Sequence, residues 1–139
     1  HYAGADKGQL QALWTFGESL GTAFQIIDDC LDLTGEETVV GKSLGTDLKL
    51  GKLTLPMIYL LSNSGDRRAE LVQMITDPRS TGSFAELQQE FDVEACVSYA
   101  LGQGQKFVER GLDALSTLPA GSARDAVAGL AEYVLARQY

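Results

Sequence analysis

The sequence predicts an all-α fold, a helix bundle, on two observations. Apolar residues recur at spacings of three and four along most of the chain, and no stretch shows the strict apolar–polar alternation of a half-buried strand. The chain has 139 residues, of which 45% are hydrophobic. A chain of this size and composition can bury a hydrophobic core without disulfides or a structural metal. We therefore expect a single all-helical domain over residues 1–139.

The first helix is expected over residues 6–34. Its apolar positions fall on one surface at helical spacing, and Gly35 follows as a C-terminal cap. We expect that surface to face the core. Its members are Leu10, Leu13, Trp14, Phe16, Leu20, Phe24, Ile27 and Leu31.

The remaining helices are shorter, except for one. A buried apolar helix over residues 54–62 has Thr54 as its N-cap and Pro56 in its first turn. A helix over 66–75 stops before Asp77 and Pro78, and Ser83 opens the next with the spacing of a capping box. The predicted ranges are 66–75, 83–90, 93–118 and 122–138.

Residues 36–53 are glycine-rich and lack a sustained apolar period, so we expect a loop of unusual length. Long ordered loops in compact domains are usually functional. Lys42, Asp47 and Lys52 recur at five-residue intervals within it, beside glycines. Lysine suits phosphate oxygens, and glycine lets backbone amides approach an anion. The same residues are also compatible with solvated lysines and an ordinary turn.

Charge is concentrated in one part of the chain. There are 11 Lys and Arg against 19 Asp and Glu, a net charge of −8, which disfavours nucleic-acid binding. Residues 18–47 hold seven acidic residues and one base, Lys42, a local charge of −6. No apolar run is long enough to cross a bilayer. Two cysteines, Cys30 and Cys96, and no secretory leader favour a reducing cytoplasm over a disulfide.

Asp28, Asp29 and Asp32 form an Asp-Asp-x-x-Asp motif within the first predicted helix. Spacings of three and four place their carboxylates on one side of the helix. In a cleft, such hard oxygen ligands suit Mg²⁺, which is often shared with a substrate phosphate. On a solvated face, the same triplet would be an ordinary acidic surface.

Gly17, Gly21 and Gln25 precede Asp28 on the same stripe of the helix. Each mid-helix glycine costs up to about 1 kcal/mol relative to alanine. The two glycines therefore indicate close approach of a ligand or of another backbone. Helix packing alone is an equally good explanation.

Three motifs follow one another over about 33 residues. Phe24 to Asp32 read FQIIDDCLD, residues 41–48 read GKSLGTDL, and residues 51–56 read GKLTLP. Together they resemble the second aspartate-rich region of the trans-prenyltransferases, also called polyprenyl or isoprenyl diphosphate synthases. The resemblance implies that the bundle is part of an isoprenoid-synthase-type fold.

The resemblance implies a Mg²⁺-dependent enzyme of isoprenoid biosynthesis. An allylic diphosphate loses its diphosphate to leave a carbocation, isopentenyl diphosphate attacks through its double bond, and a proton is removed. By the same resemblance, Asp28 ligates Mg²⁺ directly, while Asp29 and Asp32 support it directly or through bound waters.

The resemblance also implies roles for residues around the metal. Lys42 and Lys52 contact the allylic diphosphate, and Asp47 orients that group of side chains. Gln25 lies at the base of the site, and Phe24 belongs, with the Gly21 side of the helix, to the wall of a hydrocarbon cavity.

The chain departs from the family pattern because the first aspartate-rich motif is absent and Asp-Asp occurs once. We therefore expect the C-terminal portion of a prenyl diphosphate synthase, inactive alone, that forms a homo-oligomer or associates with the missing N-terminal portion. Two alternatives stay open: a noncatalytic subunit of a two-component prenyl synthase, and an acidic helical interaction module.

Overall fold

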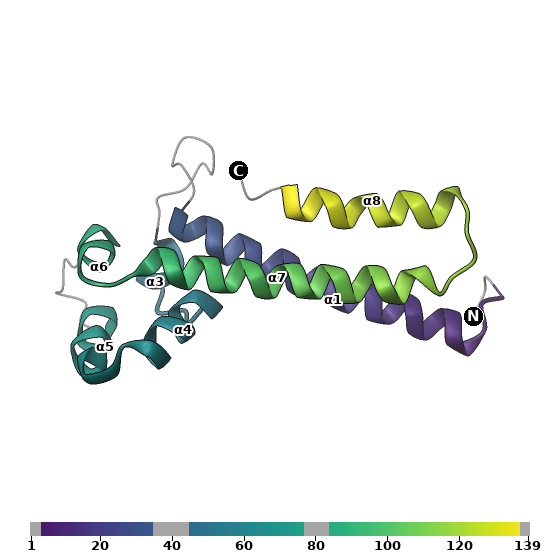
Figure 1. Ribbon diagram of the computed structural model, residues 1–139. Helices are drawn as coiled ribbons and strands as arrows, with labels where there is room; N and C mark the ends of the chain where they lie inside the picture. Colours follow the sequence, from purple (N-terminus) through teal and green to yellow (C-terminus); the bar gives the residue numbers. More distant parts are fainter. Residues whose placement is uncertain (1–3, 35–44, 77–83, 137–139) are drawn as a thin grey trace. The chain divides into compact units, whose positions relative to one another are not determined.

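The computed structural model describes residues 4–34, 45–76 and 84–136 (Figure 1). The described ranges contain helices and no strand, which confirms the predicted all-α fold. The helices are α1 (Lys7–Thr34), α3 (Thr46–Lys49), α4 (Leu55–Asn63), the 3-10 turn η1 (Gly65–Arg67), α5 (Arg68–Thr76), α6 (Phe84–Glu90), α7 (Val93–Ser116) and α8 (Ser122–Ala136).

The structure differs from the expected elements in two details. Residues 36–53 were expected to be a loop, but α3 forms one helical turn within them. Thr54 takes the N-cap position of α4 with Pro56 in the first turn, as expected, yet its side chain makes no capping hydrogen bond. The expected roles of Gly35, Pro78 and Ser83 concern positions outside the described residues.

Contacts divide the chain into two compact units. The first comprises His1–Ile27 and Gly102–Tyr139, and the second comprises Asp28–Leu101. Helices α1 and α7 each contribute residues to both units. The expectation of a single domain over residues 1–139 stays a prediction.

The first unit is built from most of α1, the second part of α7, and α8, which runs back in the opposite direction to α7 (Figure 1). Two glycines of α7 let α1 approach closely. A Cβ at Gly104 would lie 3.6 Å from side-chain atoms of Ile26 and Ile27, and one at Gly111 would lie 3.3 Å from the Cβ of Ser19. The core side chains are Ala12, Phe16, Ala23, Ile26, Ile27, Val108, Leu115, Ala131 and Val134.

The predicted apolar surface of α1 is only partly correct. Phe16 and Ile27 are buried, but Trp14 is 70% exposed and Leu10 and Leu13 are each 45% exposed. Helical spacing placed these apolar residues on one surface of the helix. It does not show which of them are covered by the rest of the chain. Helix α1 therefore has one buried face and a second apolar face that is exposed.

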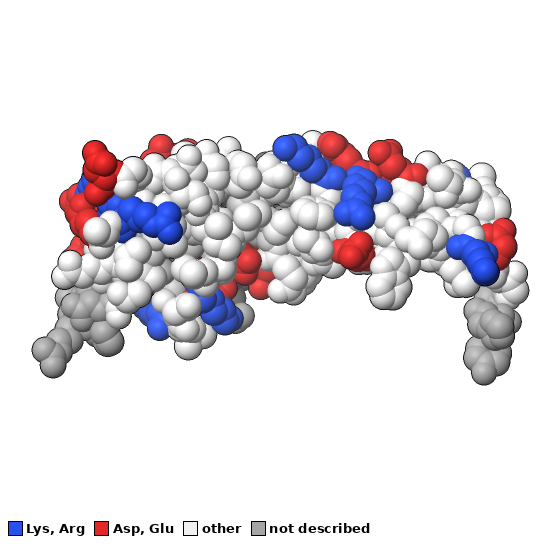
Figure 2. Space-filling view, turned by 90° about the horizontal axis from the view of Figure 1, so that it is seen from below, with Lys and Arg blue, Asp and Glu red and all other residues white. Residues whose placement is uncertain are grey.

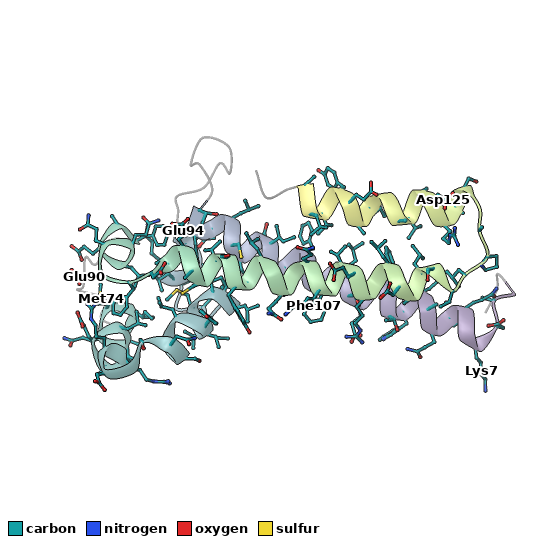
Figure 3. The ribbon with its side chains drawn as sticks, viewed as in Figure 1. Lys7, Met74, Glu90, Glu94, Phe107 and Asp125 are labelled. Carbon is teal, nitrogen blue, oxygen red and sulfur yellow. The ribbon has the colours of Figure 1, made fainter. Side chains whose placement is uncertain are left out.

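The second unit packs α4, α5 and α6 with the end of α1 and the start of α7. Arg67 connects distant parts of it: its guanidinium forms ion pairs with Glu70 and Glu90, each at 2.9 Å, and its Cζ lies 4.4 Å from the ring centroid of Phe91. Glu90 is labelled in Figure 3, at the end of α6. The core of this unit includes Met57, Leu60, Leu71, Phe84, Leu87 and Val97.

The two cysteines are both buried and unpaired, as expected. Burial raises the pKa of the Cys30 thiol to about 12 and that of Cys96 to about 11. A thiol that stays protonated is a poor nucleophile and a poor metal ligand. Both residues therefore contribute to packing.

The next two observations concern the charged side chains on the surface and the apolar character of the helices. On the face drawn in Figure 2, basic side chains are scattered among uncharged residues, and several lie close to acidic ones. None of the helices in the described ranges combines the length and the apolar character needed to cross a bilayer.

Candidate functional site

The three aspartates lie on the last two turns of α1, as predicted. Asp28 is exposed, whereas Asp29 and Asp32 are partly buried. No basic residue occupies the last turn of α1. The end of this helix therefore concentrates negative charge that other groups have to balance.

Asp32 binds the backbone of the segment that begins α3. Its Oδ1 accepts a hydrogen bond from the Thr46 N–H at 3.2 Å, and its Oδ2 accepts one from the Asp47 N–H at 3.0 Å. The backbone carbonyl of Asp32 accepts a third from the Gly45 N–H at 2.8 Å. These bonds fix the start of α3 against the end of α1.

Gly45 is required at the first position of this turn for two reasons. Its φ is 68°, in the left-handed region that disfavours other residues. A Cβ built on it would also lie 3.1 Å from the Cβ of Phe84, the first residue of α6. The turn thus lies directly against the core of its unit.

Lys52 is held by Asp47. Its Nζ lies 2.6 Å from Asp47 Oδ1, and its backbone N–H donates to the Asp47 carbonyl oxygen at 2.9 Å. The hydrogen bond and the charge of Asp47 raise the pKa of Lys52, so the ammonium stays protonated. The Lys52 side chain is 59% exposed, which leaves its remaining donors accessible to a ligand.

Asp29 lies among these charges. Burial is the main cause that raises its pKa to about 6, followed by the negative charges of Asp47 and Asp28, while Lys52 opposes the shift. The site thus brings together four of the residues predicted from the sequence: Asp29, Asp32, Asp47 and Lys52. Lys42 lies outside the described residues.

Comparison with known proteins assigns the chain to a family. The family model described as polyprenyl synthetase matches residues 1–91, well over half of the chain. The chain belongs to the polyprenyl synthetase family.

Members of the polyprenyl synthetase family are similar to it along almost its full length. It is 31% identical to heptaprenyl diphosphate synthase component 2 of Bacillus subtilis and 30% identical to octaprenyl diphosphate synthase of Haemophilus influenzae. These matches cover 99% of this chain but only 39% and 42% of those proteins. The chain thus spans about two fifths of the length of these relatives.

Solved structures of this family share the fold. Polyprenyl synthase from Caulobacter crescentus, complexed with calcium and isoprenyl diphosphate, superimposes with a TM-score of 0.85 at 31% identity, over 99% of this chain and 42% of that one. Heptaprenyl diphosphate synthase from Staphylococcus aureus superimposes with a TM-score of 0.87 at 29% identity. This match covers 97% of this chain and 42% of that one. The bundle is therefore part of the helical fold of polyprenyl synthases.

The carboxylates at the end of α1 are oxygen ligands of the kind that hard divalent cations take. Within the described residues, no group of three or more His, Cys, Asp or Glu side chains is placed to hold a metal ion. Asp32 accepts backbone N–H groups, and Asp47 pairs with Lys52. Mg²⁺ commonly uses one or two carboxylates together with waters and substrate phosphates. Asp28 and Asp29 would suffice for that kind of binding.

Phe24 and Gln25 precede the aspartates on α1, and both side chains are exposed. The exposed face also includes Gly17 and Gly21, where a Cβ would meet no described atom within 4 Å. Helix packing within the described part of this chain therefore does not explain these two glycines. A ligand or a further segment of polypeptide is the explanation that fits.

Sequence reasoning missed the link between Asp32 and α3. The two lie fourteen and fifteen residues apart, so no local spacing rule connects them. It also missed Gly104 and Gly111, the glycines at which α1 and α7 approach closely. The Gly-Thr-Asp run at residues 45–47 was the available signal for a tight turn.

Asp29→Asn is expected to stabilise the chain at about pH 8 and to have less effect at about pH 5. The pKa of Asp29 is higher in the folded chain, about 6, than the ordinary value of 3.8 for this side chain. The folded state therefore holds a proton longer, and stability is lost as the pH rises through this range. Asparagine carries no charge at either pH, so it removes that loss. Urea unfolding at the two pH values measures the difference.

Asp113→Asn is the matched control for this prediction, because Asp113 is exposed on α7. It should change stability equally at both pH values. An Asp29→Asn difference that stays constant between about pH 5 and pH 8 would show that the raised pKa is wrong.

Proposed function

We propose that this chain is the part of a Mg²⁺-dependent trans-prenyl diphosphate synthase that carries the second aspartate-rich motif. The parent enzyme condenses isopentenyl diphosphate with an allylic diphosphate. The observation that carries the proposal is the group formed by Asp29, Asp32, Asp47 and Lys52 at the end of α1. Carboxylates beside an accessible lysine are what a complex of a cation and a diphosphate requires.

The difficult step in this chemistry is the departure of a multiply charged diphosphate. Mg²⁺, when bound, would stabilise the negative charge that develops on that leaving group. Asp28 would ligate the ion directly, with Asp29 supporting it directly or through waters. Lys52, and Lys42 from the segment outside the described residues, would donate to the diphosphate oxygens.

Asp47 would orient the diphosphate-binding group by holding Lys52. Their 2.6 Å ion pair limits the range of the flexible lysine side chain before the ligand arrives. An ordered lysine loses less conformational entropy on binding than a free one. Asp47 therefore contributes to binding without contacting the diphosphate.

The exposed apolar face of α1 would border the hydrocarbon part of the substrate. Phe24 is 36% exposed, and a Cβ built on Gly21 would meet no described atom within 4 Å. An exposed apolar face of this kind suits the hydrocarbon chain of a prenyl substrate. Gln25 would lie at the base of the polar part.

Catalysis would require the portion of the family that this chain does not span. The C. crescentus relative, a protein complexed with calcium and isoprenyl diphosphate, is more than twice as long as the region matched here. We expect the isolated chain to bind Mg²⁺ and diphosphate weakly and to be inactive.

The free thiols of Cys30 and Cys96 support a reducing compartment such as the cytoplasm.

The test is binding of pyrophosphate in the presence of Mg²⁺, measured by calorimetric titration. Asp28→Ala should weaken the affinity by about tenfold or more, which corresponds to about 1.4 kcal/mol, because the proposed direct ligand is lost. Asp113→Ala removes the same charge from an exposed position on α7 and should leave the affinity unchanged. Equal affinities for the wild type, Asp28→Ala and Lys52→Ala would refute the assigned site.

A second candidate is a subunit of a two-component synthase. The favouring observation is that the B. subtilis relative is named component 2 of a heptaprenyl diphosphate synthase. The exposed Leu10, Leu13 and Trp14 on α1 are compatible with a subunit contact. Mixing the chain with a purified helical partner that carries an Asp-Asp-x-x-Asp motif, followed by sedimentation, would distinguish a heteromeric complex from a homo-oligomer.

A further inference from the structure

The carboxylate of Asp32 is bonded to the backbone of the segment that begins α3. Both of its oxygens accept backbone N–H groups, from Thr46 at 3.2 Å and from Asp47 at 3.0 Å. Hydrogen bonds from N–H groups to a carboxylate are roughly twice as strong as those between neutral groups. To ligate a cation directly, Asp32 would have to share or give up these bonds.

The segment that Asp32 holds leads directly to Lys52. The Asp47 N–H is bonded to Asp32, the Asp47 carboxylate is bonded to Lys52 Nζ at 2.6 Å, and the Asp47 carbonyl is bonded to the Lys52 N–H at 2.9 Å. The position of the lysine ammonium thus depends on Asp47. The position of the Asp47 backbone depends in turn on Asp32.

The opposite side of the turn is fixed by packing. Gly45 is buried, and a Cβ added to it would lie 3.1 Å from the Cβ of Phe84 at the start of α6, which is closer than most side chains pack. The turn is therefore held between the Asp32 carboxylate and the Phe84 ring. Removing the carboxylate would leave the Thr46 and Asp47 N–H groups without their acceptor.

We propose that Asp32 is a positioning residue, whose carboxylate holds residues 45–47 so that Asp47 places Lys52 for the diphosphate. This inference rests on the proposed function for the identity of the ligand. It divides the motif by role: Asp28 and Asp29 face the cation, and Asp32 acts through the backbone of α3.

The experiment compares Asp32→Asn with Asp28→Asn, the same chemical change on the same helix. Three quantities are measured on the full chain: hydrogen exchange of the Thr46 and Asp47 amides, Mn²⁺ affinity by electron paramagnetic resonance, and affinity for pyrophosphate with Mg²⁺. Asparagine offers one acceptor oxygen where aspartate offers two, so Asp32→Asn loses one of the two bonds.

Asp32→Asn is expected to speed exchange of these amides by about tenfold or more, the factor for a lost hydrogen bond to a charged group. It should weaken pyrophosphate binding and leave Mn²⁺ affinity within about threefold of the wild type. Asp28→Asn should weaken Mn²⁺ binding by more than Asp32→Asn does, because Asp28 is the proposed direct ligand. In a Lys52→Ala background, Asp32→Asn should have little further effect on pyrophosphate affinity, because the two act through one path.

Two results would overturn the inference. One is an Asp32→Asn variant that loses Mn²⁺ affinity as Asp28→Asn does while amide exchange stays unchanged, since Asp32 would then be a ligand. The other is an Asp32→Asn effect on pyrophosphate affinity that is as large in the Lys52→Ala background as in the wild type. If the wild type binds neither Mn²⁺ nor pyrophosphate, the proposed function fails and so does the link to diphosphate. Exchange at Thr46 and Asp47 still decides, in that case, whether Asp32 holds the turn.

Discussion

Replacing Ile27 with alanine is expected to lower the free energy of unfolding by about 2–5 kcal/mol, the usual loss for a large-to-small change in a core. Ile27 is 1% exposed in the first unit. Its neighbour on α7 is Gly104, where an added Cβ would lie 3.6 Å from Ile27 Cγ1. Because glycine has no side chain to move into the space, most of the cavity should persist.

Ile58→Ala is the matched control for Ile27→Ala, because Ile58 is 48% exposed on α4. It should cost less than about 1 kcal/mol, since little buried apolar area is lost. Urea unfolding followed by circular dichroism measures both variants. Equal losses at the two positions would contradict the described core. Domains of this size have total stabilities of about 5–15 kcal/mol, so Ile27→Ala could leave a large fraction unfolded.

Gly45→Ala is the second substitution with a large expected effect. The left-handed φ of 68° costs about 1–2 kcal/mol for a residue with a Cβ. Contact of the new methyl group with Phe84, at 3.1 Å from its Cβ, adds about 1–3 kcal/mol of overpacking. The displaced backbone should also weaken the bonds from residues 46 and 47 to Asp32.

Gly51→Ala separates the two contributions. Gly51 has a φ of 71°, but no described atom lies within 4 Å of a Cβ built there. It should show only the left-handed cost, about 1–2 kcal/mol. Denaturant unfolding of both variants measures the difference between their free energies of unfolding. If Gly45→Ala costs no more than Gly51→Ala, the turn does not pack against Phe84 as described.

The long helices could be predicted because their determinants are local. Periodic apolar positions and flanking Gly or Pro residues define α1, α7 and α8 almost to the observed bounds. The short helix α3 could not be predicted in this way. Four residues make too few intrahelical bonds to be stable alone, and the acceptor that holds them, Asp32, belongs to a different helix.

The glycines show a second limit of the sequence. Gly17 and Gly21 were identified as positions of close approach, yet no described atom lies near them. The observed close approach uses Gly104 and Gly111, which the pattern did not distinguish. Spacing identifies which residues share a helix face, whereas the partner of that face depends on tertiary structure. The residues of the candidate site could be predicted because three motifs stand in a recognisable order, but not the bonds among them.

The bonds at residues 45–47 also complete the end of α1. The last carbonyls of a helix have no intrahelical partners, and its C-terminus carries a partial negative charge. Helix α1 has no basic residue in its last turn, and the carbonyl of Asp32 is satisfied by the Gly45 N–H at 2.8 Å. Gly45, at the start of α3, thus satisfies one of the carbonyls in the last turn of this helix. The end of α1 and the α3 turn should therefore open and close as one cooperative unit, so fraying of the helix end and displacement of Lys52 from its position are the same event.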